Sequence, residues 1–312
     1  MNALMKDPRK TFGEALVEAA EKHPRIVAVS ADSSSGSGLT PFREKFPERH
    51  FEFGIMEQGI MGFCAGMATT GKIPFFAAIA PFVTARPFEM FRNDLGYMRQ
   101  NVKVVGRCGG LTYSDLGATH QSLDDMAIIR TIPGVTVINP GDPVDIRKAT
   151  LAMAAHEGPV YMRIGSPKMP VLMDENAPFQ IGRGHVLADG GDITIVATGT
   201  VLCKAAEAVR LLQEKGIRPR LINIHTIKPL DRDLILTAAK ETSRIVTVEE
   251  AYLAGGLGGS IAELLAREYP TPMKMIGIDD RYAEVGPYEE LLGLYGLKGE
   301  QIAATVEAFL NA

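Results

Sequence analysis

Cysteine is scarce in this sequence, and its few copies are not spaced as metal ligands or as a disulfide framework. Cys64, Cys108 and Cys203 are the only three among 312 residues. An odd number of widely separated cysteines argues against a disulfide-stapled fold and against a zinc site. We therefore interpret Cys64 and Cys203 as packing residues of helices, because free cysteine is usually buried. Cys108 lies in a glycine-rich loop.

Signals for nucleic-acid or membrane binding are also missing. The formal net charge is -4 and the pI is near 5.9, with no basic run, which argues against a nucleic-acid partner. The longest apolar stretch, around residues 73–83, contains proline and is too short to cross a bilayer. Residues 1–10 contain no hydrophobic signal segment. With 46% hydrophobic and 22% charged residues, the composition predicts a cytoplasmic globular protein.

What the sequence does contain is a regular alternation of strand and helix patterns. Continuous apolar runs such as 73–80 are typical of strands buried on both faces of a sheet. The first half predicts strands at 26–29, 51–53, 73–80, 102–106, 136–139 and 160–163, and helices at 57–70, 88–98, 123–130 and 143–156. Strands separated by helices indicate an α/β fold with a mostly parallel sheet covered by helices.

A second, smaller α/β unit follows a stretch rich in proline and glycine. We assign residues 1–172 to the first domain, 173–188 to a linker and 189–312 to the second domain. The second domain predicts strands at 192–198, 220–224, 244–249 and 273–278, and helices at 201–215, 232–240, 258–268 and 300–310. The first of these helices is amphipathic and is followed by Gly216, a residue typical of helix C-termini.

The segment 52–59 (EFGIMEQG) is the most informative for chemistry. It places Glu57 where a short strand turns into a glycine-containing helix. In open α/β sheets, ligands bind in the loops at the carboxyl ends of the strands. Taken by itself, the pattern also fits a solvated glutamate at a helix start, where the helix dipole favours a negative charge.

The order of several short motifs favours a ligand-binding role for Glu57, because it resembles the order found in a known enzyme family. The chain resembles the transketolase family, which includes deoxyxylulose-phosphate synthase and the β subunits of 2-oxo-acid dehydrogenases. The shared motifs run through nearly the whole chain: Ser30-Ala31-Asp32, Glu57-Gln58, Thr119-His120-Gln121, Asn139-Pro140, Gly158-Pro159-Val160, Ile227-Lys228-Pro229-Leu230 and Glu249-Glu250. The resemblance implies a pyrimidine-binding domain followed by a transketolase-type C-terminal domain.

The resemblance also implies a cofactor, thiamine diphosphate, and residues that bind it. Glu57 matches the family glutamate that bonds N1′ of the aminopyrimidine, where an acid favours the tautomer that removes the proton from the reactive carbon. Phe82 would lie against the aminopyrimidine ring, although it could instead be an ordinary core residue. Arg86 follows in the same segment and is assigned to cofactor binding.

Substrate-binding residues are implied by the same resemblance. His120 matches the family histidine that bonds the donor's hydroxyl or the oxygen at the reacting carbon. Arg9 matches an arginine that binds the terminal phosphate of the substrate, and Ser35 or Ser37 could add a hydroxyl. The serine-rich segment could alternatively be a flexible loop.

Three positions depart from the pattern of sugar-phosphate transketolases. Cys108 and Ser166 stand where the family often has a histidine and an arginine for the substrate phosphate, and Leu116 stands where it has an aspartate that reads a hydroxyl. Losing charged groups removes strong bonds to an anion. The substrate could be sulfonated, deoxy, branched or unphosphorylated, or the loops could align differently. Another cation could also compensate: Arg86, Arg107 or Arg163.

The sequence lacks the segment that holds the diphosphate end of the cofactor. A Gly-Asp-Gly segment followed by an asparagine pair would supply oxygen ligands for Mg²⁺, and we find no such set, so we assign no metal ligand to this chain. We expect a large partner subunit to hold Mg²⁺ and diphosphate in an α₂β₂ assembly that acts on sugars. The alternatives are the β chain of a 2-oxo-acid dehydrogenase and a non-catalytic paralog.

Overall fold

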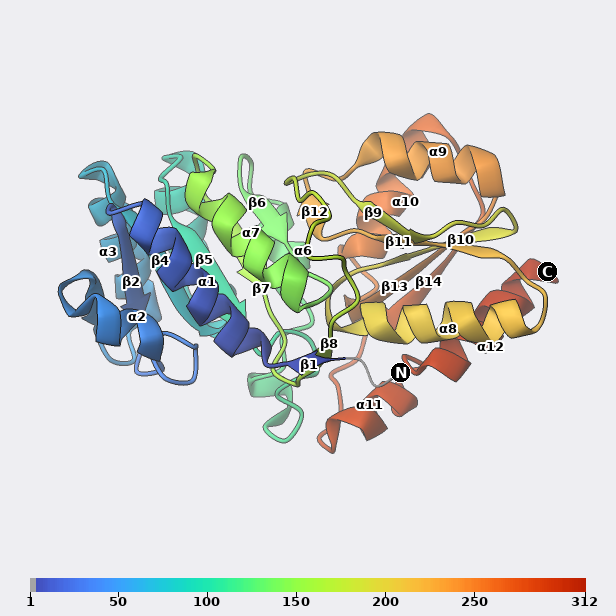
Figure 1. The fold of residues 1–312 in the computed structure, drawn as a ribbon, viewed down its shortest axis with the longest axis horizontal. Helices are drawn as coiled ribbons and strands as arrows, with labels where there is room; N and C mark the ends of the chain where they lie inside the picture. Colours follow the sequence, from blue (N-terminus) through green and yellow to red (C-terminus); the bar gives the residue numbers. More distant parts are fainter. Residues whose placement is uncertain (1–3) are drawn as a thin grey trace.

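The computed structural model describes residues 4–312, which form two α/β units side by side (Figure 1). A seven-stranded sheet forms the centre of the first unit, in the order β12-β6-β7-β5-β4-β2-β3. All neighbouring strands in it are parallel except β12, which runs antiparallel to β6. Its strands are β2 (Ile26–Ser30), β3 (His50–Glu52), β4 (Ile73–Ile79), β5 (Lys103–Arg107), β6 (Thr136–Ile138), β7 (Val160–Arg163) and β12 (Thr226–Lys228). A separate two-stranded antiparallel ribbon consists of β1 (Met5–Lys6) and β8 (Met169–Pro170).

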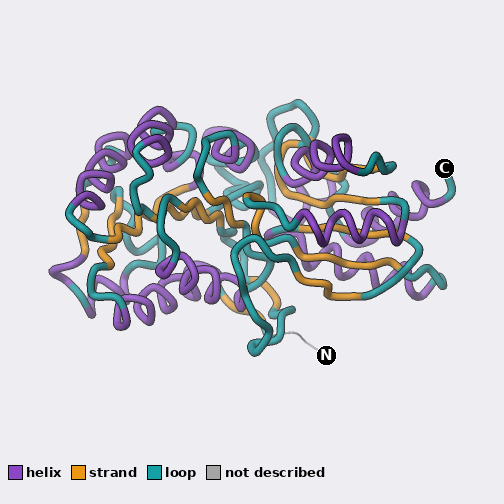
Figure 2. Tube along the Cα trace, turned by 90° about the horizontal axis from the view of Figure 1, so that it is seen from above, coloured by secondary structure: helices purple, strands orange, loops and turns teal. Residues whose placement is uncertain are grey.

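Helices cover both faces of the first sheet, as the view from above shows (Figure 2). They are α1 (Pro8–Lys22), α2 (Thr40–Lys45), η1 (Pro47–Arg49), α3 (Glu57–Thr69), α4 (Ala80–Val83), α5 (Phe88–Met90), the π-helical η2 (Phe91–Tyr97), η3 (Gly117–Thr119), α6 (Asp125–Arg130) and α7 (Pro143–Ala155). Local signals start several of them. Asp7 caps α1 by accepting hydrogen bonds from the backbone N–H groups of Arg9 and Lys10, ahead of a proline at the first helical position.

The second unit has a five-stranded sheet in the order β14-β13-β10-β11-β9, parallel except for β9. Its elements are β9 (His185–Ala188), β10 (Ile193–Ala197), η4 (Gly199–Val201), α8 (Leu202–Glu214), β11 (Pro219–Asn223), α9 (Arg232–Thr242), β13 (Ile245–Tyr252), α10 (Leu257–Glu268), β14 (Met273–Ile278), α11 (Tyr288–Leu294) and α12 (Gly299–Leu310). The mostly parallel α/β architecture in two units confirms the predicted fold class.

Two strands show that the units are more interwoven than the sequence patterns indicate. Strand β9 lies inside the stretch 173–188, expected as a linker, and pairs with β11. Strand β12 follows β11 in the chain, yet it pairs with β6 and so extends the first unit's sheet. Both are short edge strands, and their pairing depends on distant partners rather than on local sequence.

A buried polar network joins the two units. Arg163 at the end of β7 donates to the Asp125 carboxylate at 3.1 Å and to the Glu250 backbone carbonyl at 2.5 Å. Tyr161 donates to the other Asp125 oxygen at 2.5 Å, and the Glu250 carboxylate accepts from the backbone N–H of Leu111 at 2.5 Å. All five residues are buried. No helix within residues 4–312 is long and apolar enough to cross a membrane.

Candidate active site

The expected site residues lie along one edge of the first sheet, because its parallel strands end there together. After β3 the chain turns through Gly54, which has a φ of +72°, and enters α3 with Glu57 as its first residue. After β4 it enters α4, which contains Phe82. After β5 it enters the long loop that contains His120. The topology thus brings side chains far apart in sequence to one edge.

Glu57, Arg86 and Phe82 form the centre of this edge. The Glu57 side chain is only 4% exposed, and its carboxylate accepts a hydrogen bond from Arg86 Nη1 at 2.8 Å. The Arg86 guanidinium carbon lies 3.9 Å from the centroid of the Phe82 ring. A planar cation is therefore held between an aromatic face and a buried carboxylate. Gln58 helps to fix this segment by donating to the Arg86 carbonyl at 3.1 Å.

His120 also packs against Phe82. The two ring centroids are 5.1 Å apart in an edge-to-face arrangement. Tyr113 packs against His120 in the same way at 5.4 Å. The hydroxyl of Thr119 lies 2.9 Å from His120 Nδ1, which leaves Nε2 for another partner. Sequence reasoning did not include Tyr113, whose position in a glycine-rich loop gave no specific signal.

A second group lies where β2 and β5 end, around Arg107. Arg107 is 7% exposed and donates to the Ser37 hydroxyl at 3.1 Å and to Cys108 Sγ at 3.3 Å. Cys108 has a φ of +57°, a conformation uncommon outside glycine. Arg9 donates to the Asp7 carboxylate at 3.0 Å, and this hydrogen bond is the main cause that raises the pKa of Arg9.

The structure gives less support for a role of the remaining expected residues. Ser35 is exposed, Ser166 is half-buried, and neither side chain makes a hydrogen bond to another described residue. Leu116 is 45% exposed on the loop before His120. Of the three arginines considered as replacement cations, Arg163 is already bonded to Asp125. Within residues 4–312 no three His, Cys, Asp or Glu side chains are grouped as a metal site.

Comparison with known proteins identifies the family. Residues 5–170 match the family model "Transketolase, pyrimidine binding domain", and residues 182–302 match "Transketolase, C-terminal domain". The chain belongs to the transketolase family. The resemblance drawn from the short motifs is thereby confirmed.

Several similar proteins are named as transketolase subunits and match this chain over nearly their whole length. The chain is 40% identical to an apulose-4-phosphate transketolase subunit from Phocaeicola vulgatus, covering 97% of each chain. It is 37% identical to "6-deoxy-6-sulfo-D-fructose transketolase subunit SqwH" of Clostridium sp. (strain MSTE9), covering 94% of this chain and 91% of that one. Among solved structures, "Split gene transketolase, inactive beta4 tetramer" matches with a TM-score of 0.92, 39% identity and 98% coverage of both chains.

Proposed function

We propose that this chain is the small subunit of a thiamine-diphosphate-dependent transketolase, which transfers a two-carbon ketol unit from a ketose to an aldose. The arrangement of Glu57, Arg86 and Phe82 supports this most directly. Arg86 places a flat group with N–H donors on the Phe82 ring and against the Glu57 carboxylate. A flat aminopyrimidine whose ring nitrogen shares a proton with Glu57 could occupy the same place, so these residues fit the cofactor once the half-exposed Arg86 side chain moves aside.

Each residue then has a distinct task. The bound cofactor would supply a carbon nucleophile for the ketose carbonyl and a sink for the electron pair of the broken carbon–carbon bond. Glu57 would hold a proton at the pyrimidine nitrogen, and burial would keep water from competing for it. Phe82 would fix the plane of the ring. His120, beside Phe82, would bond substrate oxygens through its free Nε2.

The donor is proposed to be a ketose with a terminal anionic group. Arg107 bonds both Ser37 and Cys108, so a cation persists although the family histidine is absent. Arginine binds phosphate and related oxyanions with charge-assisted hydrogen bonds. The two split relatives are named for a sugar phosphate and a sulfonated sugar, both anionic. This supports an atypical anionic ketose rather than an unphosphorylated one.

A partner chain is part of the proposal. We infer that Mg²⁺ and the diphosphate are bound by a large subunit, in an α₂β₂ heterotetramer that works in the cytoplasm on small sugars. The similar structure that contains only the small subunit type is described as inactive. This agrees with a site that requires groups from a second chain type.

The test is co-expression with a subunit that contains the missing diphosphate-binding domain, followed by an assay of ketol transfer with thiamine diphosphate and Mg²⁺. Donors should include phosphorylated, sulfonated and free ketoses. Glu57→Ala and Glu57→Gln should each lower turnover by at least about 100-fold while leaving the assembly intact by size-exclusion chromatography. Glu89→Gln is a matched control, because Glu89 is exposed and paired only on the surface with Arg92 and Asn93. Full turnover by either Glu57 variant would refute the mechanism.

A further inference from the structure

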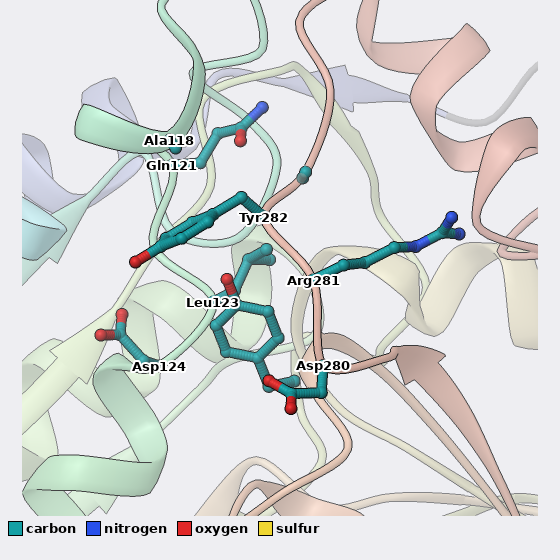
Figure 3. Close-up of a pocket in the computed structure, with 9 residues that line it drawn as sticks. Ala118, Gln121, Leu123, Asp124, Asp280, Arg281 and Tyr282 are labelled. Atoms are coloured by element: carbon teal, nitrogen blue, oxygen red, sulfur yellow. The ribbon is translucent and has the colours of Figure 1, made fainter.

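A pocket of about 350 Å³ lies at the junction of the two units, outside the candidate active site. One wall comes from η3 and the loop that follows it up to the residue before α6, and the other from the end of β13 and the loop after β14 (Figure 3). Two hydrogen bonds fasten the walls to each other. Gln121 Nε2 donates to the Glu284 carbonyl at 2.9 Å, and the Tyr252 N–H donates to the Leu123 carbonyl at 2.9 Å. The volume is at the lower end for sites of small organic ligands.

The polar groups that face this pocket are mostly hydrogen-bond acceptors. Gln121 is 6% exposed, and its side-chain oxygen is buried without a hydrogen-bond partner within the described chain. Figure 3 shows this oxygen on the side of Tyr282, with the amide nitrogen turned away. A buried polar atom without a partner costs free energy, so a donor from a ligand would stabilise it.

Two carboxylates line the same pocket without a counter-ion. Neither Asp124 nor Asp280 forms an ion pair within residues 4–312, and Asp124 makes no cap hydrogen bond to α6. Burial and the neighbouring Asp125 raise the pKa of Asp124, as expected for a desolvated carboxylate. The cation that Asp124 feels, Arg163, is already paired with Asp125 at 3.1 Å.

The arginine of the pocket wall does not compensate these charges. The guanidinium of Arg281 extends away from Asp124 and Tyr282 (Figure 3). Its central carbon lies 5.0 Å from the centroid of the Tyr295 ring. The pocket therefore presents negative charge and acceptors, and little positive charge.

Two tyrosines complete the lining. Tyr282 is 81% exposed and its ring points toward Asp124 (Figure 3). Burial raises the pKa of the Tyr252 hydroxyl, and Asp124, Tyr282 and Asp280, which line the same pocket, raise it further. Aromatic faces beside carboxylates attract organic cations through both their quadrupole and the neighbouring charges.

We propose that this interdomain pocket is a binding site for a small organic cation, a primary alkylammonium or alkylguanidinium. Its N–H groups would donate to the Gln121 oxygen and to Asp124, and its alkyl part would lie against Tyr252 and Tyr282. The proposal does not rest on the proposed function, since none of these side chains is assigned to contact the substrate or the cofactor. The site is distinct from an acidic surface patch because its unpartnered amide is buried.

The test uses the full-length chain and three probes of similar size: n-butylammonium and agmatine as cations, and butyrate as an anion. Binding is followed by NMR chemical-shift perturbation and by isothermal titration calorimetry. The cations should bind saturably, with shifts centred on Gln121, Asp124 and Tyr252. Asp124→Asn should weaken binding about tenfold, because a charge-assisted bond is lost. Asp279→Asn is the matched control and should leave affinity unchanged, because Asp279 is exposed and is not among the residues that line the pocket.

Folding does not confound this comparison. Asp124 makes no cap bond to the described helix α6 and Tyr282 is mostly exposed, so Asp124→Asn and Tyr282→Ala should both keep the native spectrum. Tyr282→Ala should weaken cation binding severalfold. Equal affinity of the wild-type protein and the Asp124→Asn variant, preferential binding of butyrate, or no saturation by either cation up to about 50 mM would each overturn the proposal.

Discussion

Replacing Arg163 by methionine tests the buried network that joins the two units. Arg163 and Asp125 are 3% and 0% exposed, and their charged groups are 3.1 Å apart. The variant removes the positive charge but leaves the Asp125 carboxylate buried beside the Tyr161 hydroxyl. Removing one partner of a buried ion pair typically costs about 3–5 kcal/mol. We expect Arg163→Met to lose that much free energy of unfolding.

A double-mutant cycle measures the coupling energy between Arg163 and Asp125. Asp125→Asn alone should also destabilise the protein, because it leaves the guanidinium of Arg163 uncompensated. The double variant contains neither buried charge, so its loss should be about 2 kcal/mol smaller than the sum of the single losses. Urea denaturation followed by fluorescence of the tyrosines and by circular dichroism measures all four proteins.

Additive losses within about 0.5 kcal/mol would refute the reasoning, because they would show that the two charges are not coupled. A loss below about 1 kcal/mol for Arg163→Met would refute it as well, since that is the range of surface pairs. Arg147→Met is the matched control. Arg147 pairs with Glu18 at 2.7 Å but is half-exposed, and its loss should stay below about 1 kcal/mol.

Three further predictions concern other residues. Burial raises the pKa of Glu249 from 4.5 to about 7, so the folded state binds a proton more tightly and the free energy of unfolding falls as pH rises between these values. Glu249→Gln should reduce that fall by about 3 kcal/mol, measured by urea titrations at pH 4.5 and 8. An unchanged dependence of stability on pH would contradict this. Phe82→Ala should raise the thiamine diphosphate concentration needed for half-activation about 2- to 10-fold, and no change would argue against ring stacking. Arg107→Met should raise KM for anionic donors about 10- to 100-fold and leave free ketoses unaffected, whereas an equal change for both would indicate a general defect.

Most of the fold could be predicted because its strongest signals are local. The strand Ile73–Ile79 is a continuous apolar run, and the structure buries it between neighbours on both sides. The helix Leu202–Glu214 has an apolar stripe and differs from the prediction by one residue at each end. Helix α1 (Pro8–Lys22) was not predicted, although Asp7 followed by proline is a typical helix start. Strand β12 could not be predicted, since its three residues pair with a strand far back in the chain.

The grouping of the candidate site residues was predictable to the extent that they belong to short motifs at strand ends. Glu57, Phe82, Arg86 and His120 gather at one edge because parallel strands end together. The bonds of Arg107 to Ser37 and Cys108 were not predictable, because the sequence does not specify which of several arginines approaches which loop. Such pairings depend on the packing of whole strands.

The loop that contains His120 shows why the second unit matters for the first. The Glu250 carboxylate accepts a hydrogen bond from the Leu111 N–H near the start of this loop, and the Gln121 side chain donates to the Glu284 carbonyl at its end. In between, the Ser114 carbonyl accepts from the Gly286 N–H at 3.2 Å. The second unit thus supports the loop at three points. A histidine that must meet a substrate oxygen within hydrogen-bonding distance requires such support, because a shift of about 1 Å can cost 100-fold in rate. The C-terminal domain therefore contributes to the proposed reaction by holding the His120 loop in place.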